Sequence, residues 1–315
     1  SNNLLLGVAG QGPVGPTPFD STLIGNSVWL DGSADFLSAE LGAKTRTKAV
    51  IGTWIQKTGF STTDATIFSK KGTAQFAIRM QDQSAKAGKI SIFDYDGSAN
   101  QYEAESTSML LRDNGWYHIM ISIDTTAIAG NRLRYYINGI DQTSTLTVTT
   151  DYTASDNPSI TGGSGEPTQW GVGYAGNNQF NPCYLAQSFM LDDDSIQNGD
   201  VSVTDILDPF TFGTNGSQFT PKSDAAIAAL ASTAGGDSFC LDFADSSGTD
   251  AVNLGNDISS NNNNFTPTSM AAANQTGSSS SSAFATWNPL RVNTQTQTFA
   301  EGNLCLLYTS PSPRD

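Results

Sequence analysis

Apolar and polar residues alternate with a period of two along much of the chain, which is typical of β-strands that bury one face. In the segment 75–81, Phe76, Ile78 and Met80 fall on one side and mainly polar residues fall on the other. The segment 116–124 repeats this alternation with an isoleucine-rich side. We expect further strands at 48–59, 65–69, 89–95, 133–137 and 184–191.

The connections between these segments carry turn signals, and one of them has a helical pattern. Asn138 and Gly139 suit a two-residue type I′ hairpin turn, because both residues tolerate positive φ. The segment 223–230 begins with Ser223 as a helix N-cap and continues with an alanine-rich body. Many short strands with almost no helical period predict an all-β fold, an antiparallel sandwich, rather than alternating β-α-β units.

The composition excludes some classes of partner. The chain has 315 residues, of which 14% are charged, and its net charge is −15. In an average globular protein about 25% of residues are charged. With 15 basic against 30 acidic residues, the chain has no general electrostatic attraction for nucleic acid or anionic lipid. No apolar run approaches the roughly 20 residues that cross a bilayer, so we expect neither nucleic-acid binding nor membrane insertion.

Short motifs over about residues 26–194 resemble laminin G-like domains in their order and spacing. The segment from Trp116 to Ile119 resembles the W-x-H-v strand of that family, and the segment from Tyr135 to Gly139 resembles its l-Y-v-N/D-G hairpin. The other matching motifs lie at 28–33, 50–55, 67–70 and 184–189. The resemblance implies a concanavalin A-like jelly-roll sandwich, the fold of legume lectins, pentraxins and some glucanases.

The flanking segments resemble tail-fibre-type proteins of marine phages. The matching segments are 2–7, 239–245, 254–257, 261–267 and 287–290. This resemblance implies a virion surface protein with an extracellular location. It implies a host glycan or surface receptor and other virion proteins as partners.

The chain divides into five parts. These are a lead-in at 1–20, a laminin G-like sandwich at 21–197, an extension with a short helix and strands at 198–270, a Ser/Asn/Thr-rich linker at 271–304 and a terminal stretch at 305–315. The terminal stretch resembles a translated sequencing-adapter artefact of metagenomic assemblies. Two alternatives exist for the segments 239–245 and 263–268. They either return to complete the sandwich, which gives a permuted strand order, or open a second module.

The chain has three cysteines, which cannot form an even disulfide framework. We expect Cys183 and Cys240 to be buried free thiols, and a disulfide between them is the alternative. Cys305 lies in the terminal stretch that resembles an artefact.

The sequence lacks the residue constellations of a hydrolytic enzyme. His118, the single histidine, lies opposite the isoleucine side of its strand, and no neighbouring nucleophile completes a Ser–His–Asp triad. Glucanases of the resembled fold carry the motif E-x-D-x-x-E on one strand, whereas Glu103 and Glu105 are followed by Ser108 at the position of the last acid. We therefore predict that the protein is not an enzyme and has no catalytic residues. His118 is expected to be structural.

Calcium is the candidate cofactor, because the resembled fold offers acidic loops and calcium takes six to eight oxygen ligands. Asp192, Asp193 and Asp194 form the candidate site, and a solvated acidic loop is the alternative interpretation. Pentraxin-like sites take ligands from the preceding loop, where residues 176–179 offer amides but no acid. That departure weighs against a pentraxin-type site. The other acidic candidates are Asp94, Asp96, Asp242, Asp245 and Asp250.

Two loops combine aromatic rings, which stack on sugars, with amides and carboxylates, which bind hydroxyl groups. The candidate ligand-binding residues are Asp94, Tyr95, Asp96, Asn100, Tyr102, Gln169, Trp170, Tyr174, Asn177 and Asn178. Packing in the core is the alternative role for Trp170 and Tyr174.

These observations predict a non-catalytic β-sandwich module that binds a carbohydrate or receptor. The alternatives are a purely structural fibre module and a glycan-cleaving enzyme of the glucanase type. A polar groove with exposed aromatics would favour binding, two acids on one strand in a cleft would favour catalysis, and an extended apolar patch would favour assembly. The acidic net charge disfavours an anionic polysaccharide unless calcium bridges it.

Overall fold

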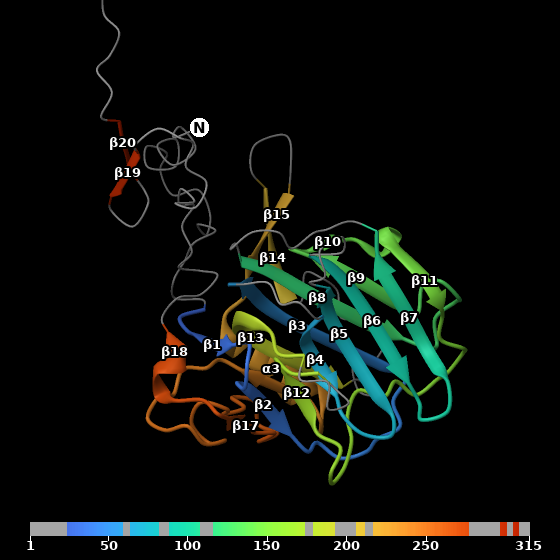
Figure 1. Cartoon of the computed structure of the whole chain (residues 1–315). Coiled ribbons are helices and arrows are strands. Elements are labelled where there is room, and N and C mark those ends of the chain that lie inside the picture. The colour runs from blue at the N-terminus through green and yellow to red at the C-terminus, as the bar shows by residue number, and fades with distance from the viewer. Residues whose placement is uncertain are drawn as a thin grey trace, which may run out of the picture. The chain divides into compact units, whose positions relative to one another are not determined.

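The computed structural model describes residues 24–58, 64–81, 88–107, 116–173, 179–192, 206–211, 217–276, 297–300 and 305–308. Only the backbone is described for residues 208–211, 217–220, 297–300 and 305–308. The chain forms two compact units, Ser1–Ser282 and Ala283–Asp315. The described part of the first unit contains two large antiparallel sheets and a separate two-stranded one (Figure 1). In the second unit, β19 (Gln297–Ala300) pairs with β20 (Cys305–Tyr308) in antiparallel orientation.

The first sheet has its strands in the order β10-β9-β8-β3-β13-β1-β18. Their bounds are β10 (Ile140–Asp141), β9 (Leu133–Ile137), β8 (Trp116–Asp124), β3 (Lys48–Lys57), β13 (Pro182–Asp192), β1 (Ser27–Asp31) and β18 (Gln275–Thr276). A further strand, β16 (Phe239–Leu241), pairs with β13 beyond the part that pairs with β1. Between these two parts β13 has a bulge, where Gln187 has a positive φ of 46°.

The second sheet has its strands in the order β11-β7-β6-β5-β4-β12-β2-β17. Their bounds are β11 (Leu146–Thr150), β7 (Asn100–Ser106), β6 (Lys89–Tyr95), β5 (Gln75–Gln81), β4 (Ala65–Lys70), β12 (Thr168–Trp170), β2 (Phe36–Ala39) and β17 (Thr266–Thr268). The short helix η1 (Thr143–Thr145) links β10 of the first sheet to β11 of the second.

The two sheets enclose a core of inward-facing apolar side chains. Phe76, Ile78 and Met80 of β5 and Ile119 and Ile121 of β8 are all buried in it, so the predicted strand faces are confirmed. Burial of one such side chain contributes about 1.5–3 kcal/mol. The predicted all-β antiparallel sandwich is confirmed with them.

Segments late in the chain add strands to both sheets. β17 pairs with β2 through Pro267 and Leu37, and β18 pairs with β1 through Thr276 and Ser27. β16 adds a third strand of this kind. Residues 239–241 and 266–268 therefore contribute strands to the two sheets.

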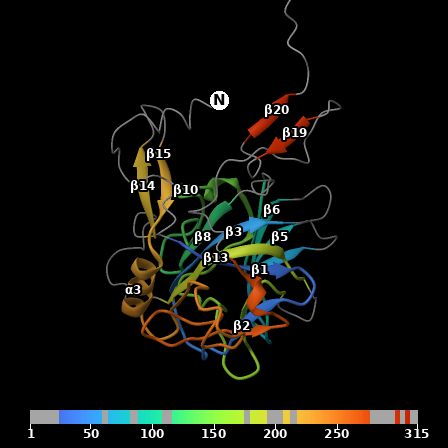
Figure 2. The same cartoon turned by 90° about the vertical axis from the view of Figure 1, so that its left-hand side faces the viewer.

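An outer layer covers the first sheet on the side away from the core. It includes α3 (Asp224–Ala234) and the start of β14 (Leu207–Thr211), which pairs with β15 (Ser217–Pro221) (Figure 2). Ser223 caps the helix by accepting a hydrogen bond from the backbone N–H of Ala226, as predicted. Among the described residues, no helix is long and apolar enough to span a membrane.

This layer packs on an apolar outward side of the first sheet. Val50, Met120 and Phe189 lie in one buried cluster with the apolar residues of α3. The Phe189 ring occupies the space where a Cβ of Gly52 would lie, at 2.4 Å, so glycine is required there. Cys240 also belongs to this cluster, and both it and Cys183 are buried free thiols, as predicted.

His118 lies on the outward side of β8 inside this cluster and is fully buried. Its ring lies edge-on to Trp54 at a centroid distance of 5.1 Å and stacks on Phe189 at 6.3 Å. Within the described part of the chain neither ring nitrogen has a hydrogen-bond partner. Burial lowers the pKa of the imidazole to about 3, so the ring packs in its neutral form.

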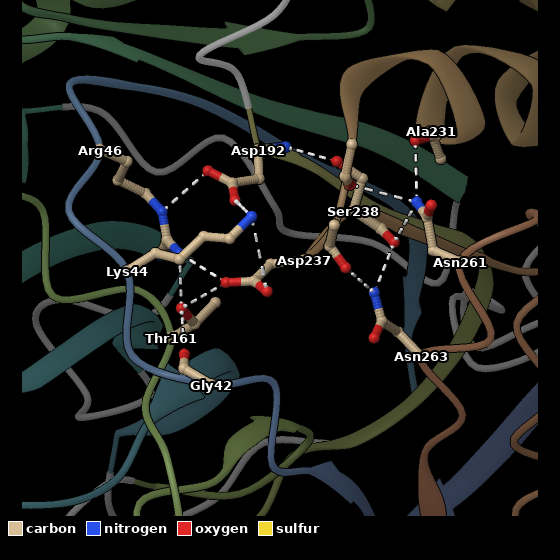
Figure 3. Close-up of polar contacts among 12 residues, drawn as sticks. Gly42, Lys44, Arg46, Thr161, Asp192, Ala231, Asp237, Ser238, Asn261 and Asn263 are labelled. Carbon is tan, nitrogen blue, oxygen red and sulfur yellow. Dashed lines mark hydrogen bonds and ion pairs between the residues drawn. The ribbon is translucent and has the colours of Figure 1, made fainter.

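A buried ion network joins the first sheet to the extension and to the connection that leads to β12 (Figure 3). Arg46 is 1% exposed, and its Nε donates to Asp192 Oδ1 at 2.9 Å. Its Nη2 donates to Asp237 Oδ2 at 2.8 Å and to Thr161 Oγ1 at 2.6 Å. Lys44, which is partly exposed, lies 3.4 Å from Asp192. Desolvation raises the pKa of Asp237, and the two cations oppose this effect.

Two asparagine side chains hold the turn that follows α3 (Figure 3). The Nδ2 of Asn261 donates to the backbone carbonyls of Ala231, Gly235 and Ser238 at 3.0–3.1 Å. The Nδ2 of Asn263 donates to the same Ser238 carbonyl at 2.9 Å. The turn that carries Asp237 is thereby fixed by residues just before β17.

Substitution of Arg46 tests the importance of the buried network. Arg46→Met leaves two buried carboxylates without their guanidinium, so we expect the free energy of unfolding to fall by about 3–5 kcal/mol. Arg134→Met is the control, because Arg134 and Asp141 form a pair that is 43% exposed on both sides and should lose under about 1 kcal/mol. Urea unfolding followed by tryptophan fluorescence measures both. Equal losses for the two variants would contradict the assignment.

Substitution of His118 tests its burial in the neutral form. The imidazole takes up a proton near pH 6.5 in the unfolded chain but only near pH 3 in the folded one. As the pH falls below 6.5, the unfolded state gains the proton first, and stability drops by up to about 1.4 kcal/mol per pH unit. His118→Phe removes this loss. We expect wild-type stability to fall relative to the variant between pH 7 and pH 5 in urea titrations; a pH-independent difference would refute the assignment.

Candidate functional site

The second sheet carries an open groove over β5, β6, β7 and β11, which lie side by side in Figure 1. The groove has a volume of about 420 Å³, and its lining is mostly polar and charged. The lining residues are Arg79, Gln81, Lys89, Ser91, Glu103, Ala104, Glu105, Ser106, Thr107, Thr147 and Thr149. A polar sheet face of this kind can remain in water, unlike the apolar outward side of the first sheet.

Strand pairing brings four of these side chains into one row. Arg79 is paired with Ser91, Ser91 with Glu105, and Glu105 with Thr147. The row crosses four strands that lie about 4.8 Å apart. The Nη2 of Arg79 donates to Ser91 Oγ at 3.1 Å, so the row is hydrogen-bonded at its β5 end.

Glu105 accepts hydrogen bonds from side chains of β5 and β6. Its Oε2 accepts from Gln81 Nε2 at 3.1 Å, and its Oε1 accepts from Lys89 Nζ at 3.4 Å. The Lys89 and Glu105 side chains are 21% and 32% exposed, whereas Gln81 is buried. The groove therefore offers an accessible acceptor and an accessible donor side by side.

An aromatic surface continues from this polar row along β6. The rings of Phe93 and Tyr95 are nearly parallel, with an interplanar angle of 9° and a centroid distance of 6.4 Å. The Arg79 guanidinium lies 5.9 Å from the centroid of Phe93. Phe93 is paired with Glu103, whose Oε2 accepts from Asn100 Nδ2 at 3.0 Å. Flat rings and hydrogen-bonding groups are thus neighbours on this face.

Three residues predicted from sequence, Tyr95, Asp96 and Asn100, lie at this end of the sheet. Tyr95 and Asn100 are paired across β6 and β7. Asp96 is exposed in the turn between them and accepts from the backbone N–H groups of Ser98 and Ala99, which lowers its pKa. The structure brings Tyr95 and Asn100 to the candidate site and gives Asp96 a role in the turn.

Asp94 and Tyr102 face the interior instead. The hydroxyl of Tyr152 donates to Asp94 Oδ2 at 2.6 Å, and the backbone N–H of Ser159 donates to the same oxygen at 3.1 Å. Burial raises the pKa of Asp94 to about 6 despite these bonds. Tyr102 stacks on Tyr152 at a centroid distance of 5.0 Å. Both side chains are buried, so neither belongs to the groove surface.

Gln169 and Trp170 of β12 are buried as well. The Trp170 ring packs edge-on against Phe68 at 4.9 Å and against Phe239 at 6.4 Å, so it occupies the core position that was its alternative role. The remaining candidates lie outside the described residues: Tyr174, Asn177 and Asn178.

The candidate calcium site falls partly outside the described residues, because Asp193 and Asp194 are among those not described. Asp192 is buried and paired with Arg46 and Lys44. Across the described ranges, no group of three or more His, Cys, Asp and Glu side chains is arranged to hold a metal ion. Asp192 therefore serves the ion network of the fold.

Most groove residues were absent from the sequence-based candidates. Arg79, Lys89 and Ser91 are outward residues of strands that the alternation predicted correctly. The polar side of those strands was thus the sequence feature that could have indicated the groove residues. Which polar residues meet depends on the order of the strands, and this order is not visible in a single strand.

A family model described as "Concanavalin A-like lectin/glucanases superfamily" matches residues 19–180. The chain belongs to this superfamily. The groove lies on the second sheet of its concanavalin A-like sandwich, within the matched residues. The comparison with curated proteins gave no match.

Several solved structures are similar to this chain at low sequence identity. A heptameric SAP-like pentraxin from Limulus polyphemus has 11% identity and a TM-score of 0.37, over 56% of this chain and 77% of that one. A putative carbohydrate binding protein from Bacteroides ovatus has 12% identity and a TM-score of 0.39, over 63% and 60%. Tailspike protein 2 from Escherichia coli O157:H7 bacteriophage CAB120 has 13% identity and a TM-score of 0.34, over 59% and 27%.

Substitutions in the groove should leave the sandwich intact. The pair of Lys89 and Glu105 is partly exposed, so Glu105→Gln should change the free energy of unfolding by under about 1 kcal/mol. Asp192→Asn removes a buried carboxylate from Arg46 and should cost several kcal/mol. Urea unfolding curves measure both changes. A loss for Glu105→Gln as large as that for Asp192→Asn would show that Glu105 is a structural residue.

Proposed function

We propose that this concanavalin A-like domain is a non-catalytic carbohydrate-binding module whose ligand lies in the groove of the second sheet and on the aromatic rings beside it. The observation that carries the proposal is the parallel pair of Phe93 and Tyr95 beside the hydrogen-bonded side chains of Glu103 and Asn100. A sugar ring has an apolar face of C–H groups and a rim of hydroxyl groups. Flat aromatic rings next to polar side chains complement both parts.

One observation favours a second candidate function, glycoside hydrolysis. Glu103 and Glu105 both line the groove from one strand, as paired catalytic carboxylates would. Such catalysis needs one carboxylic acid that is kept protonated by an apolar environment. Glu105 lies beside the Lys89 ammonium and is 32% exposed, and Glu103 is exposed. Neither carboxylate has the apolar environment that such an acid needs, so the pair is better suited to binding than to acid catalysis.

We propose further that the module belongs to a surface protein of a phage virion and binds a host glycan or surface receptor. The support is the resemblance of the segments 2–7, 239–245 and 287–290 to tail-fibre-type phage proteins. In this setting the module lies outside the host cell, with other virion proteins as neighbours.

Substitution of the aromatic surface tests the proposed function. On a glycan array, the full chain should show saturable binding to a defined glycan class, and Phe93→Ala should weaken it about tenfold, equivalent to about 1.4 kcal/mol. Trp29→Ala is the matched control, because Trp29 is a partly exposed aromatic residue of the first sheet. It should leave the affinity unchanged.

The array is read with calcium and then with a chelator, and the bound glycan is assayed for new reducing ends. Folded protein that binds no glycan in either buffer would overturn the proposal in favour of a structural module. Loss of binding for Trp29→Ala alone would move the site to the first sheet. New reducing ends that disappear in Glu105→Gln would establish the hydrolase instead.

A further inference from the structure

We infer that the groove selects a neutral oligosaccharide by its adjacent hydroxyl groups, and that Glu105 is the residue that determines this specificity. The inference rests on the proposed function and names the ligand class of the same groove. It derives from the charges of the groove, the surroundings of Glu105 and the geometry of β6.

The charged residues of the groove are balanced. Two cations, Arg79 and Lys89, and two carboxylates, Glu103 and Glu105, line it. Lys89 lies 3.4 Å from Glu105, and Arg79 lies 3.7 Å from Asp64. Each cation already faces a carboxylate, and the whole chain carries a charge of −15. A sulfated or carboxylated glycan would gain little attraction here, so the groove suits an uncharged one.

Glu105 and Lys89 together match two hydroxyl groups on neighbouring carbons. A hydroxyl group both donates and accepts, whereas a carboxylate accepts and an ammonium donates. One hydroxyl of such a pair can donate to the exposed part of Glu105 while its neighbour accepts from Lys89. The distance of 3.4 Å between Glu105 Oε1 and Lys89 Nζ places the two complementary groups close enough for adjacent hydroxyls. Hydrogen bonds to charged groups are also stronger than neutral ones.

Gln81 fixes the position of Glu105 through a hydrogen bond. It is 7% exposed, lines the groove, and donates to Glu105 Oε2 at 3.1 Å. Its carbonyl Oε1 accepts no hydrogen bond from any described residue. The buried amide therefore orients the carboxylate before a ligand arrives, which lowers the entropy cost of binding.

The geometry of β6 sets the length of the ligand. Lys89, Ser91, Phe93 and Tyr95 are alternate residues of this strand and share its outward side. A strand rises about 3.3 Å per residue, and Glu105 is paired with Ser91, so Glu105 and Tyr95 are about 13 Å apart along the strand. A single sugar cannot cover both Glu105 and the rings of Phe93 and Tyr95. The groove thus takes an oligosaccharide that runs along β6.

Periodate oxidation provides the test, because it cleaves the bond between carbons that carry adjacent hydroxyls. The probes are dextran and galactomannan, each untreated or oxidised with periodate and then reduced with borohydride, together with the anionic polymers alginate and carrageenan. Affinity gel electrophoresis and calorimetry with the full chain measure binding. We expect an untreated neutral polymer to bind at least tenfold more tightly than its oxidised form and than either anionic polymer.

Variants separate the role of Glu105 from that of charge in general. Glu105→Gln should weaken binding of the untreated polymer at least tenfold, and Glu40→Gln, at an exposed acid outside the groove, should not. Equal binding of oxidised polymer, preference for an anionic polymer, or a Glu105→Gln variant with wild-type affinity would each overturn the inference while leaving carbohydrate binding in place. Failure of the folded protein to bind any polymer would overturn the proposed function as well.

Discussion

Three parts of the molecule meet at the guanidinium of Arg46. This residue precedes β3 of the first sheet and contacts Asp192 at the end of β13 and Asp237 after α3. It also contacts Thr161 in the connection that leads to β12 of the second sheet. A buried ion without its partner costs several kcal/mol, so these contacts must form together. The positions of the outer layer, the first sheet and the connection to β12 are therefore coupled through one side chain.

The outward sides of the two sheets differ, because one is covered by the outer layer and the other carries an open groove. On the first sheet, Val50, Met120 and Phe189 face outward and require the cover of α3. On the second sheet, Arg79 and Glu105 occupy equivalent outward positions and line an open groove. The helix-containing extension is thus part of the fold's stability, while the opposite surface stays open to solvent.

The alternation of residues predicted the strands and much of the core, but it predicted only part of the candidate site. Asp94 is the next alternate residue of β6 after the buried Ile90 and Ile92, so the alternation itself predicts that its side chain faces inward. Trp170 lies in a strand of three residues, which is too short to show a period. The contacts that matter most are remote, since Arg46 meets Asp237 across 191 positions of sequence. A local pattern contains no information about such a contact.

The pairing of β18 with β1 has a mechanical consequence. β1 and β18 are antiparallel neighbours, and Ser27 lies opposite Thr276, so the chain enters and leaves the sandwich at adjacent points of one sheet edge. A force that pulls these two points apart is borne first by the two residue pairs that join β18 to β1. It opens their hydrogen bonds one after another, as in a zipper, rather than loading them together in shear. Under tension along the chain, β18 would peel away first, while the groove, on the other sheet, would carry none of the load.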